Sequence, residues 1–250
     1  MHTLTPLQLQ QRHYMNHIWT PPAFVPRNTL TPLADYIAHS TLIHCRELLP
    51  ADLSKHSFLF VNCGSGVDTH FFASEGAGRV MVTDLSERAV RLAHEHNARI
   101  HGVSATTEQL PFADGAFDFV GVRSGLHHLD DPYEGLREMA RVAKLGVFFI
   151  EGQKTSLVPM FARVGMLEEK EEAGNTVYRF TREELQERLP AIGIARWDVV
   201  IGSFLQVPAL LKLARHVPGK FSARLWRGLV RALNIAWGRW GNAFIVVAWK

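Results

Sequence analysis

The sequence has little cysteine and no long hydrophobic run. Only two of its 250 residues are cysteines, Cys45 and Cys63. Two isolated thiols form neither a disulfide scaffold nor a metal cluster, which favours a reducing compartment. No stretch reaches the roughly 18 apolar residues of a membrane-spanning helix, and the first residues lack the pattern of a signal peptide. These absences predict a cytoplasmic protein, with peripheral membrane contact as an open alternative.

Acidic residues are missing from one segment. Residues 203–242 contain seven Lys or Arg but no Asp or Glu. Apolar residues at helical spacing from Phe221 to Trp237 predict a helix with arginines on its other face. Such a helix can pack on the sheet, join a homodimer, cover a substrate, or lie on anionic lipid. Nucleic acid is not expected as a partner, because no recognition module accompanies the basic residues.

A strand, a tight turn and a helix follow one another near residue 60. The apolar run from Phe58 leads into Asn62-Cys63-Gly64-Ser65-Gly66, and a helix is expected from about Asp68. Glycines let a ligand approach the backbone and meet the N–H groups at the start of the helix. Asp84 ends the next strand, where a carboxylate can accept hydrogen bonds from ribose hydroxyls.

Strands and helices alternate along the rest of the chain, which predicts an α/β fold with a parallel sheet covered on both faces. Strands are expected at 79–84, 102–105, 117–122, 145–151, 195–201 and 243–249, and helices at 33–49, 86–100, 131–143 and 181–189. Thr31 or Thr29 is available to cap the first helix. We expect an N-terminal helical cap (1–57) followed by one main domain (58–250), and an exposed acidic stretch at 168–174.

Three motifs follow the third strand in order. Residues 108–118 read EQLPFADGAFD, residues 125–132 read GLHHLDDP, and residues 136–142 read LREMARV. In these motifs the chain resembles the class I S-adenosylmethionine-dependent methyltransferases, in particular the small-molecule group that includes the ubiquinone/menaquinone methylases. The resemblance covers about residues 56–152. It implies a Rossmann-like sheet of order 3-2-1-4-5-7-6 with an antiparallel last strand, and residues 203–242 inserted between strands 6 and 7.

The resemblance also implies the site. S-adenosylmethionine is the expected cofactor, and S-adenosylhomocysteine the product. The cofactor-binding residues it implies are Asn62, Cys63, Gly64, Ser65, Gly66, Asp84, Leu85, Thr106, Thr107, Glu108 and Arg123. His127 and His128 are the catalytic candidates, since a histidine at this place takes the acceptor's proton in O-methylating relatives. We prefer His127; the alternative is that these histidines pack structurally at the next helix start. Arg123 can pair with the cofactor's carboxylate or an anionic substrate, or lie on the surface.

Three positions depart from the family pattern. Phe60 stands where the family has an acid, Asn62 replaces a glycine, and Thr106 replaces an acid that faces adenine. Asn tolerates a positive φ, so the turn can survive. A repurposed fold that does not catalyse methyl transfer is the first alternative. A nicotinamide-dependent oxidoreductase is the second, although the third glycine of its fingerprint is missing.

No metal is expected, because adjacent histidines do not easily face one ion and no carboxylate stands at ligand spacing. The sequence predicts a methyltransferase that acts on a small-molecule acceptor, with oxygen as the preferred acceptor atom; an anionic or lipid-linked acceptor is an open alternative.

Overall fold

The computed structural model describes residues 4–18, 31–154, 170–202 and 243–250, with a few isolated positions between 216 and 232. The strands are β1 (Ser57–Phe60), β2 (Arg79–Asp84), β3 (His101–Ser104), β4 (Phe117–Arg123), β5 (Ala143–Gly152), β6 (Arg196–Gly202) and β7 (Ala243–Trp249). The α-helices are α1 (Pro6–Ile18), α2 (Pro32–Leu48), α3 (Val67–Ser74), α4 (Glu87–His96), α5 (Pro132–Val142) and α7 (Arg182–Ala191). Two 3-10 turns, η2 (Leu53–Lys55) and η3 (Leu126–His128), complete the described elements.

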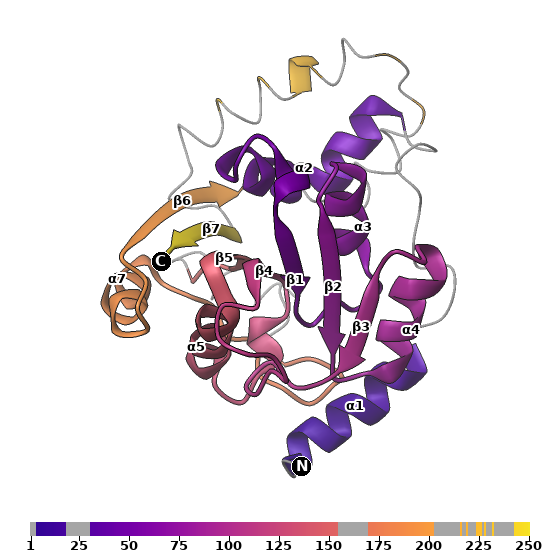
Figure 1. Ribbon diagram of the computed structural model, residues 1–250, viewed down its shortest axis with the longest axis vertical. Coiled ribbons are helices and arrows are strands. Elements are labelled where there is room, and N and C mark those ends of the chain that lie inside the picture. Colours follow the sequence, from indigo (N-terminus) through magenta and orange to yellow (C-terminus); the bar gives the residue numbers. More distant parts are fainter. Residues whose placement is uncertain are drawn as a thin grey trace.

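The strands form one sheet in the order β3-β2-β1-β4-β5-β7-β6 (Figure 1). Strands β1 to β5 pair in parallel, whereas β7 runs antiparallel to both β5 and β6. The predicted α/β fold, strand order and antiparallel last strand are confirmed. Since β1, β2 and β4 lie side by side and run in the same direction, the loops that follow them meet at one edge of the sheet.

Alternation along β1 divides its side chains between the two faces of the sheet. Phe58 and Phe60 join a core with Phe72 of α3 and Phe148 of β5. Leu59 belongs to the opposite core, together with buried residues of α5 and α7. Helices therefore cover both faces, with α2 and α3 on one and α5 and α7 on the other.

Most element boundaries lie within a few residues of the predicted ones. Helix α2 begins at Pro32, and the Thr31 side chain accepts a hydrogen bond from the N–H of Ala34, as a helix cap does. Helix α4 ends at His96, earlier than predicted, because Asn97 takes an extended conformation with φ −153°. Helix α1 has no counterpart in the predicted elements. The basic segment 203–242 lies outside the described residues, apart from isolated positions.

Within the described residues, no helix has both the length and the apolar character needed to cross a membrane.

Candidate functional site

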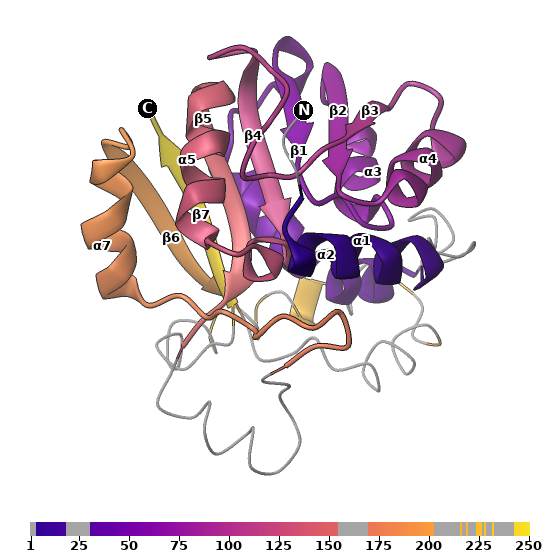
Figure 2. The ribbon, with the colours of Figure 1, turned by 90° about the horizontal axis from the view of Figure 1, so that it is seen from below.

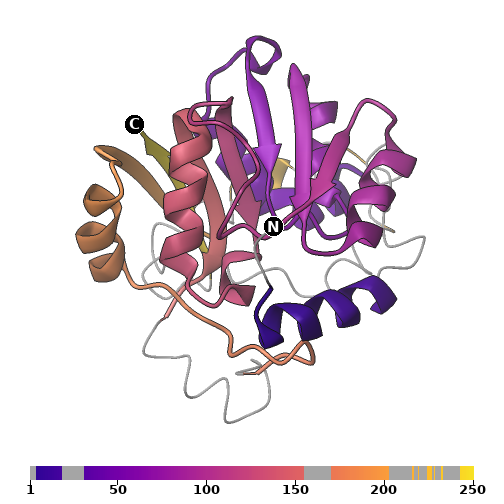
Figure 3. The same cartoon turned by 60° about the horizontal axis from the view of Figure 1, so that its bottom comes forward.

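A cavity of about 570 Å³ opens at the carboxyl ends of β1, β2 and β4. Its walls come from the loops after β1 to β4, from residues 171–173, and from α1. Helix α1 runs across this edge of the sheet (Figures 2 and 3), and its side chains line one side of the cavity. Every predicted cofactor-binding residue except Gly66 lines the cavity; of the predicted catalytic pair, His128 does and His127 does not.

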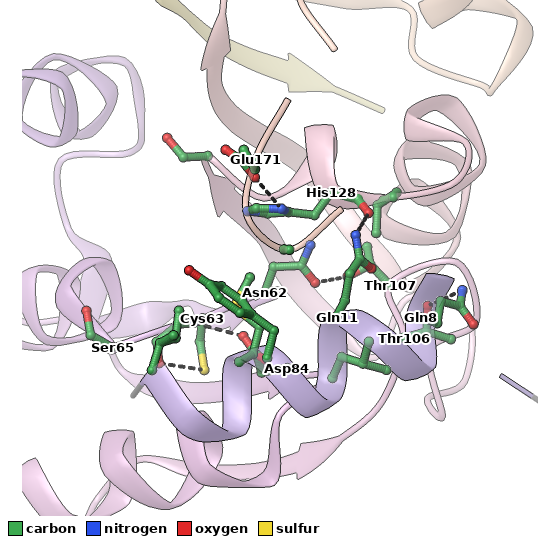
Figure 4. A pocket seen from close by; sticks show the side chains of 18 of the residues that line it. Gln8, Gln11, Asn62, Cys63, Ser65, Asp84, Thr106, Thr107, His128 and Glu171 are labelled. Atoms are coloured by element: carbon green, nitrogen blue, oxygen red, sulfur yellow. Dashed lines mark hydrogen bonds and ion pairs between the residues drawn. The ribbon is translucent and has the colours of Figure 1, made fainter. Parts of the chain in front are cut away.

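The turn after β1 keeps its shape without the family's first glycine. Asn62 has φ 48° and Gly64 φ 49°, both in the left-handed region. The Asn62 amide also joins three loops, because its Nδ2 donates to the Gly125 carbonyl at 2.7 Å and its Oδ1 accepts from Thr107 Oγ1 at 2.7 Å. A glycine could make neither bond. Asn62 therefore takes the left-handed conformation open to a glycine and adds a link across the site, part of which, the bond to Thr107, is seen in Figure 4.

Asp84 is a buried carboxylate at the end of β2. Its Oδ2 accepts the N–H of Gly64 at 2.9 Å, and its Oδ1 accepts the N–H of Ser86 at 2.8 Å. Burial raises the pKa of Asp84, and these two backbone bonds oppose that shift. Each carboxylate oxygen can accept a further hydrogen bond. Asp84 thus holds two loops together and still presents acceptors to a ligand.

The cysteine in this turn has no acid–base role. The Cys63 thiol lines the cavity, and burial raises its pKa well above the usual value. It is therefore a neutral thiol near pH 7.

Polar side chains of the loop after β3 form another part of the cavity wall. Thr106 Oγ1 donates to Glu108 Oε2 at 3.1 Å, and Gln8 of α1 donates to the same carboxylate oxygen. Thr107 is fully buried and turns toward Asn62. Both threonines line the cavity, but the Thr107 hydroxyl is committed to Asn62, whereas Thr106 is only partly buried.

Phe60 does not stand in the cavity wall. Its ring is 2% exposed and lies in the core, 5.2 Å from the Phe72 ring centroid. The cavity instead contains an acid that the sequence analysis did not select, Asp68 in the first turn of α3. Arg123 donates to Asp68 Oδ1 through Nε at 2.7 Å, and its Nη2 lies 2.6 Å from the same oxygen. Burial raises the pKa of Asp68, and Arg123 opposes the shift.

Two carboxylates hold His127. Its Nδ1 lies 2.7 Å from Oε2 of the buried Glu151, and its Nε2 lies 3.3 Å from Glu171 Oε1. Burial alone would lower the pKa of His127, but the two carboxylates raise it to about 10. His127 is therefore an imidazolium near pH 7, with both nitrogens occupied, and is poorly placed to accept a proton. The geometry therefore favours His128 over His127 as the catalytic candidate.

His128 faces the cavity. Its Nδ1 lies 3.0 Å from Glu171 Oε2 and 3.3 Å from Asn175 Oδ1 (Figure 4). The partners hold the pKa of Glu171 well below its usual range despite burial, so this carboxylate is ionised. Because Glu171 Oε2 and Asn175 Oδ1 can only accept hydrogen bonds, the proton of a neutral His128 lies on Nδ1. Nε2 is then the proton-accepting nitrogen.

Two expectations need correction. The acidic stretch 168–174 is not simply exposed, since Glu171 lines the cavity and Ala173 is 2% exposed. The argument against a metal also fails. Donor atoms of His127, His128 and Glu171 lie within 4.8 Å of one another, because a distant loop supplies the carboxylate that the local spacing lacked.

Helix α1 contributes Gln8, Gln11, Tyr14, Met15 and Ile18 to the cavity. Gln11 Nε2 donates to the His128 carbonyl at 2.7 Å, and Asn16 Oδ1 accepts from Ser86 Oγ at 2.7 Å. These bonds fix the helix to the loops after β4 and β2. The sequence offers a weak signal for this role, since α1 buries few side chains.

Sequence similarity to known proteins covers the part of the chain that carries the three motifs. Residues 59–150 match the model of a methyltransferase domain family. The chain is 35% identical over 147 residues to a demethylmenaquinone methyltransferase of Corynebacterium urealyticum, covering 58% of this chain and 54% of that protein. It is 26% identical over 204 residues to a malonyl-[acyl-carrier protein] O-methyltransferase of Pseudescherichia vulneris, covering 76% and 79%.

Among solved structures, the geranyl diphosphate C-methyltransferase of Streptomyces coelicolor superposes with a TM-score of 0.64 at 14% identity, covering 100% and 99% of the two chains. That likeness shows the fold. The chain spans about half the length of the demethylmenaquinone methyltransferase that it matches. The resemblance seen in the motifs is confirmed over residues 59–150, which match the methyltransferase domain model, and the sequence relatives include demethylmenaquinone and ubiquinone/menaquinone methyltransferases.

Proposed function

We propose that the chain transfers a methyl group from S-adenosylmethionine to a hydroxyl oxygen of a small-molecule acceptor. The observation that carries this proposal is the cavity at the carboxyl ends of β1, β2 and β4, which combines an intact backbone turn with the buried Asp84 carboxylate and a histidine. When bound, S-adenosylmethionine supplies an electrophilic methyl group on a sulfonium.

Asp84 would bind the adenosine part. Its two oxygens are fixed by the N–H groups of Gly64 and Ser86, so their remaining lone pairs point in set directions. A ribose diol supplies two donors for such a carboxylate. Thr106, at the wall formed by the loop after β3, offers an acceptor for the amino group of the base.

Asp68 and Arg123 would bind the amino-acid part. This part is a zwitterion, and the pair presents one anion and one cation to the same cavity. Both guanidinium contacts go to Asp68 Oδ1, so Oδ2 can accept from an ammonium group. Arg123 can bind the carboxylate. The pair thus supplies the charge that Phe60 does not.

His128 would take the acceptor's proton. Glu171 orients the ring through Nδ1, which leaves Nε2 as the base. His128 would accept the hydroxyl proton as the acceptor oxygen takes the methyl group, and the cofactor would leave as S-adenosylhomocysteine. Most of the rate enhancement comes from alignment of the two reactants. Helix α1 lines one side of the cavity and would limit the access of water to it.

Two observations bear on the alternatives. Positive φ at Asn62 and Gly64 gives the turn after β1 the left-handed residues of a tight turn, which supports cofactor binding over a fold that has lost its ligand. A relative matched over 76% of this chain is by name an O-methyltransferase, which supports oxygen as the acceptor atom. A product methylated on carbon would show that carbon is the acceptor atom, and the proposed binding of S-adenosylmethionine would stand.

The test is methyl transfer with matched histidine variants. The full chain is incubated with S-adenosylmethionine and hydroxyl-bearing aromatic acceptors, and methylated products are identified by mass spectrometry. His128→Ala should lower turnover about 10²- to 10⁴-fold with little change in S-adenosylhomocysteine affinity. His101→Ala, at an exposed position on β3, is the control. A fully active His128→Ala variant would remove the base from the mechanism, and failure to bind either adenosyl ligand would refute the proposed function.

A further inference from the structure

Three side chains with metal-binding atoms meet beside the cavity. His127 Nε2 lies 3.3 Å from Glu171 Oε1, and His128 Nδ1 lies 3.0 Å from Glu171 Oε2. Ligand atoms bound to a tetrahedral ion at about 2.0–2.1 Å are separated by about 3.3 Å. The two histidine–carboxylate distances lie near this value, and one donor atom from each residue lies within 4.8 Å of the other two, so adjustment of the side chains would bring all three onto one small ion.

The next shell of residues holds these ligands in place. Glu151 is 2% exposed, and its Oε1 accepts the N–H groups of Gly125 and Leu126, both at 2.7 Å. Its Oε2 then meets His127 Nδ1, which directs Nε2 toward Glu171. A carboxylate on the far nitrogen of a histidine is the usual support of a metal ligand.

Asn175 supports the carboxylate ligand. Its Nδ2 donates to Glu171 Oε2 at 3.1 Å and to the His127 carbonyl at 3.1 Å. The loop that carries Glu171 is thereby tied to η3, which carries both histidines. Residues far apart in the sequence are thus fixed into one cluster.

The charge of the cluster also favours a cation. Glu151 and Glu171 both face His127, so once an ion displaces the proton on His127 Nε2, the two carboxylates leave net negative charge in a partly buried place. A divalent ion compensates this charge more completely than one proton does. Imidazole and carboxylate together are donors that Zn²⁺ and similar divalent ions accept.

We propose that His127, His128 and Glu171 bind one divalent transition-metal ion at the edge of the cavity. Three protein ligands leave a fourth position, which can face the cavity that His128 and Glu171 line. The site rests on the geometry of the cluster and does not require methyl transfer. If the proposed transfer also holds, an acceptor hydroxyl at the fourth position would release its proton to solvent more readily, and His128 would act as a ligand in place of a base.

The experiment titrates the chelator-treated full chain with Co²⁺, and then displaces the Co²⁺ with Zn²⁺. The visible absorption of Co²⁺ reports tetrahedral coordination, and calorimetry gives the stoichiometry. We expect one ion per chain. His128→Ala and Glu171→Gln should each weaken binding at least 10-fold, and Glu151→Gln about 10- to 100-fold. The free energy of unfolding of each variant in urea serves as the check on folding.

His17→Ala is the matched control, because His13 and His17 form a histidine pair on α1 with ring centroids 4.4 Å apart. Binding that survives His17→Ala and is lost in His128→Ala supports the site. The absence of a tetrahedral spectrum overturns the proposal. So does binding that is lost in His17→Ala, or that is unchanged in both His128→Ala and Glu171→Gln. Loss of methyl transfer in a chain that still binds the ion would count against the proposed function alone.

Discussion

Replacing Asn62 by glycine tests how the turn after β1 is held. Glycine keeps the left-handed conformation that Asn62 adopts at φ 48°. It removes the hydrogen bond to the Gly125 carbonyl and the one from Thr107, both 2.7 Å long. Each such bond contributes about 0.5–1.5 kcal/mol net, so Asn62→Gly should cost about 1–3 kcal/mol. The upper half of this range is expected because the Thr107 hydroxyl is fully buried and loses its partner.

The comparison with Asn62→Ala separates the side chain from the backbone. Alanine loses the same bonds and also takes an unfavourable positive φ, which adds about 1–2 kcal/mol. Thr107→Val removes one of the two bonds and should show about half of the loss seen in Asn62→Gly. The free energy of unfolding is measured in urea, and thermal unfolding should shift by about 2–4 °C for each kcal/mol. Equal stability of Asn62→Gly and wild type, within about 0.5 kcal/mol, would refute the linking role.

Three further changes probe the core, the cofactor site and a buried ion pair. Phe60→Asp should destabilise the chain by more than about 3 kcal/mol and give no tighter S-adenosylhomocysteine binding, because the side chain lies in the core; calorimetry showing tighter binding would contradict this placement. Asp84→Asn should weaken that binding about 10- to 100-fold, since a charge-assisted hydrogen bond contributes about 1.5–3 kcal/mol, and unchanged affinity would exclude it from the ligand site. Burial alone would raise the pKa of Glu138, but hydrogen bonds from Arg141 and from the Leu110 N–H hold it below the usual value. The resulting stabilisation is therefore present above the unfolded pKa of about 4.3 and is lost as the pH falls through the folded value. Unfolding in urea should show a flatter pH dependence for Glu138→Gln between about pH 5 and pH 3, and an unaltered slope would rule the pair out.

The strands and their order could be predicted because the sequence pattern of each element is local. Apolar runs of strand length alternate with capped helices, and the order of the motifs follows the order of the loops. The conformation of Asn62 was also predictable, since asparagine is one of the few residues other than glycine that adopt a positive φ. The position of Phe60 follows from strand alternation, which places it with Phe58 on the α3 side.

The rest of the site depends on contacts between distant parts of the chain. Glu171 joins His127 and His128 only because its loop folds back over η3. Helix α1 reaches the cavity through single polar contacts such as that of Gln11, which leave no periodic pattern in the sequence. Asp68 is an intermediate case. An acid in the first turn of the helix after a glycine turn could have been selected, because helix starts commonly face ligands.

The division into a cap (1–57) and a main domain stays a prediction. Helix α2 contributes Leu42 and Cys45 to the same core as the sheet. The predicted membrane contact and homodimer also stay open, because both depend on residues 203–242, outside the described ranges.

Calorimetric titration with S-adenosylhomocysteine, with NAD as the comparison ligand, tests the central claim most directly. The arrangement of Asp84, Asp68 and Arg123 around one cavity predicts saturable binding of one S-adenosylhomocysteine per chain. It also predicts weaker binding in Asp84→Asn and in Asp68→Asn, and no binding of NAD. The absence of S-adenosylhomocysteine binding at about 1 mM, a concentration that detects interactions of about −4 kcal/mol, would contradict the assignment of this cavity to the methyl donor.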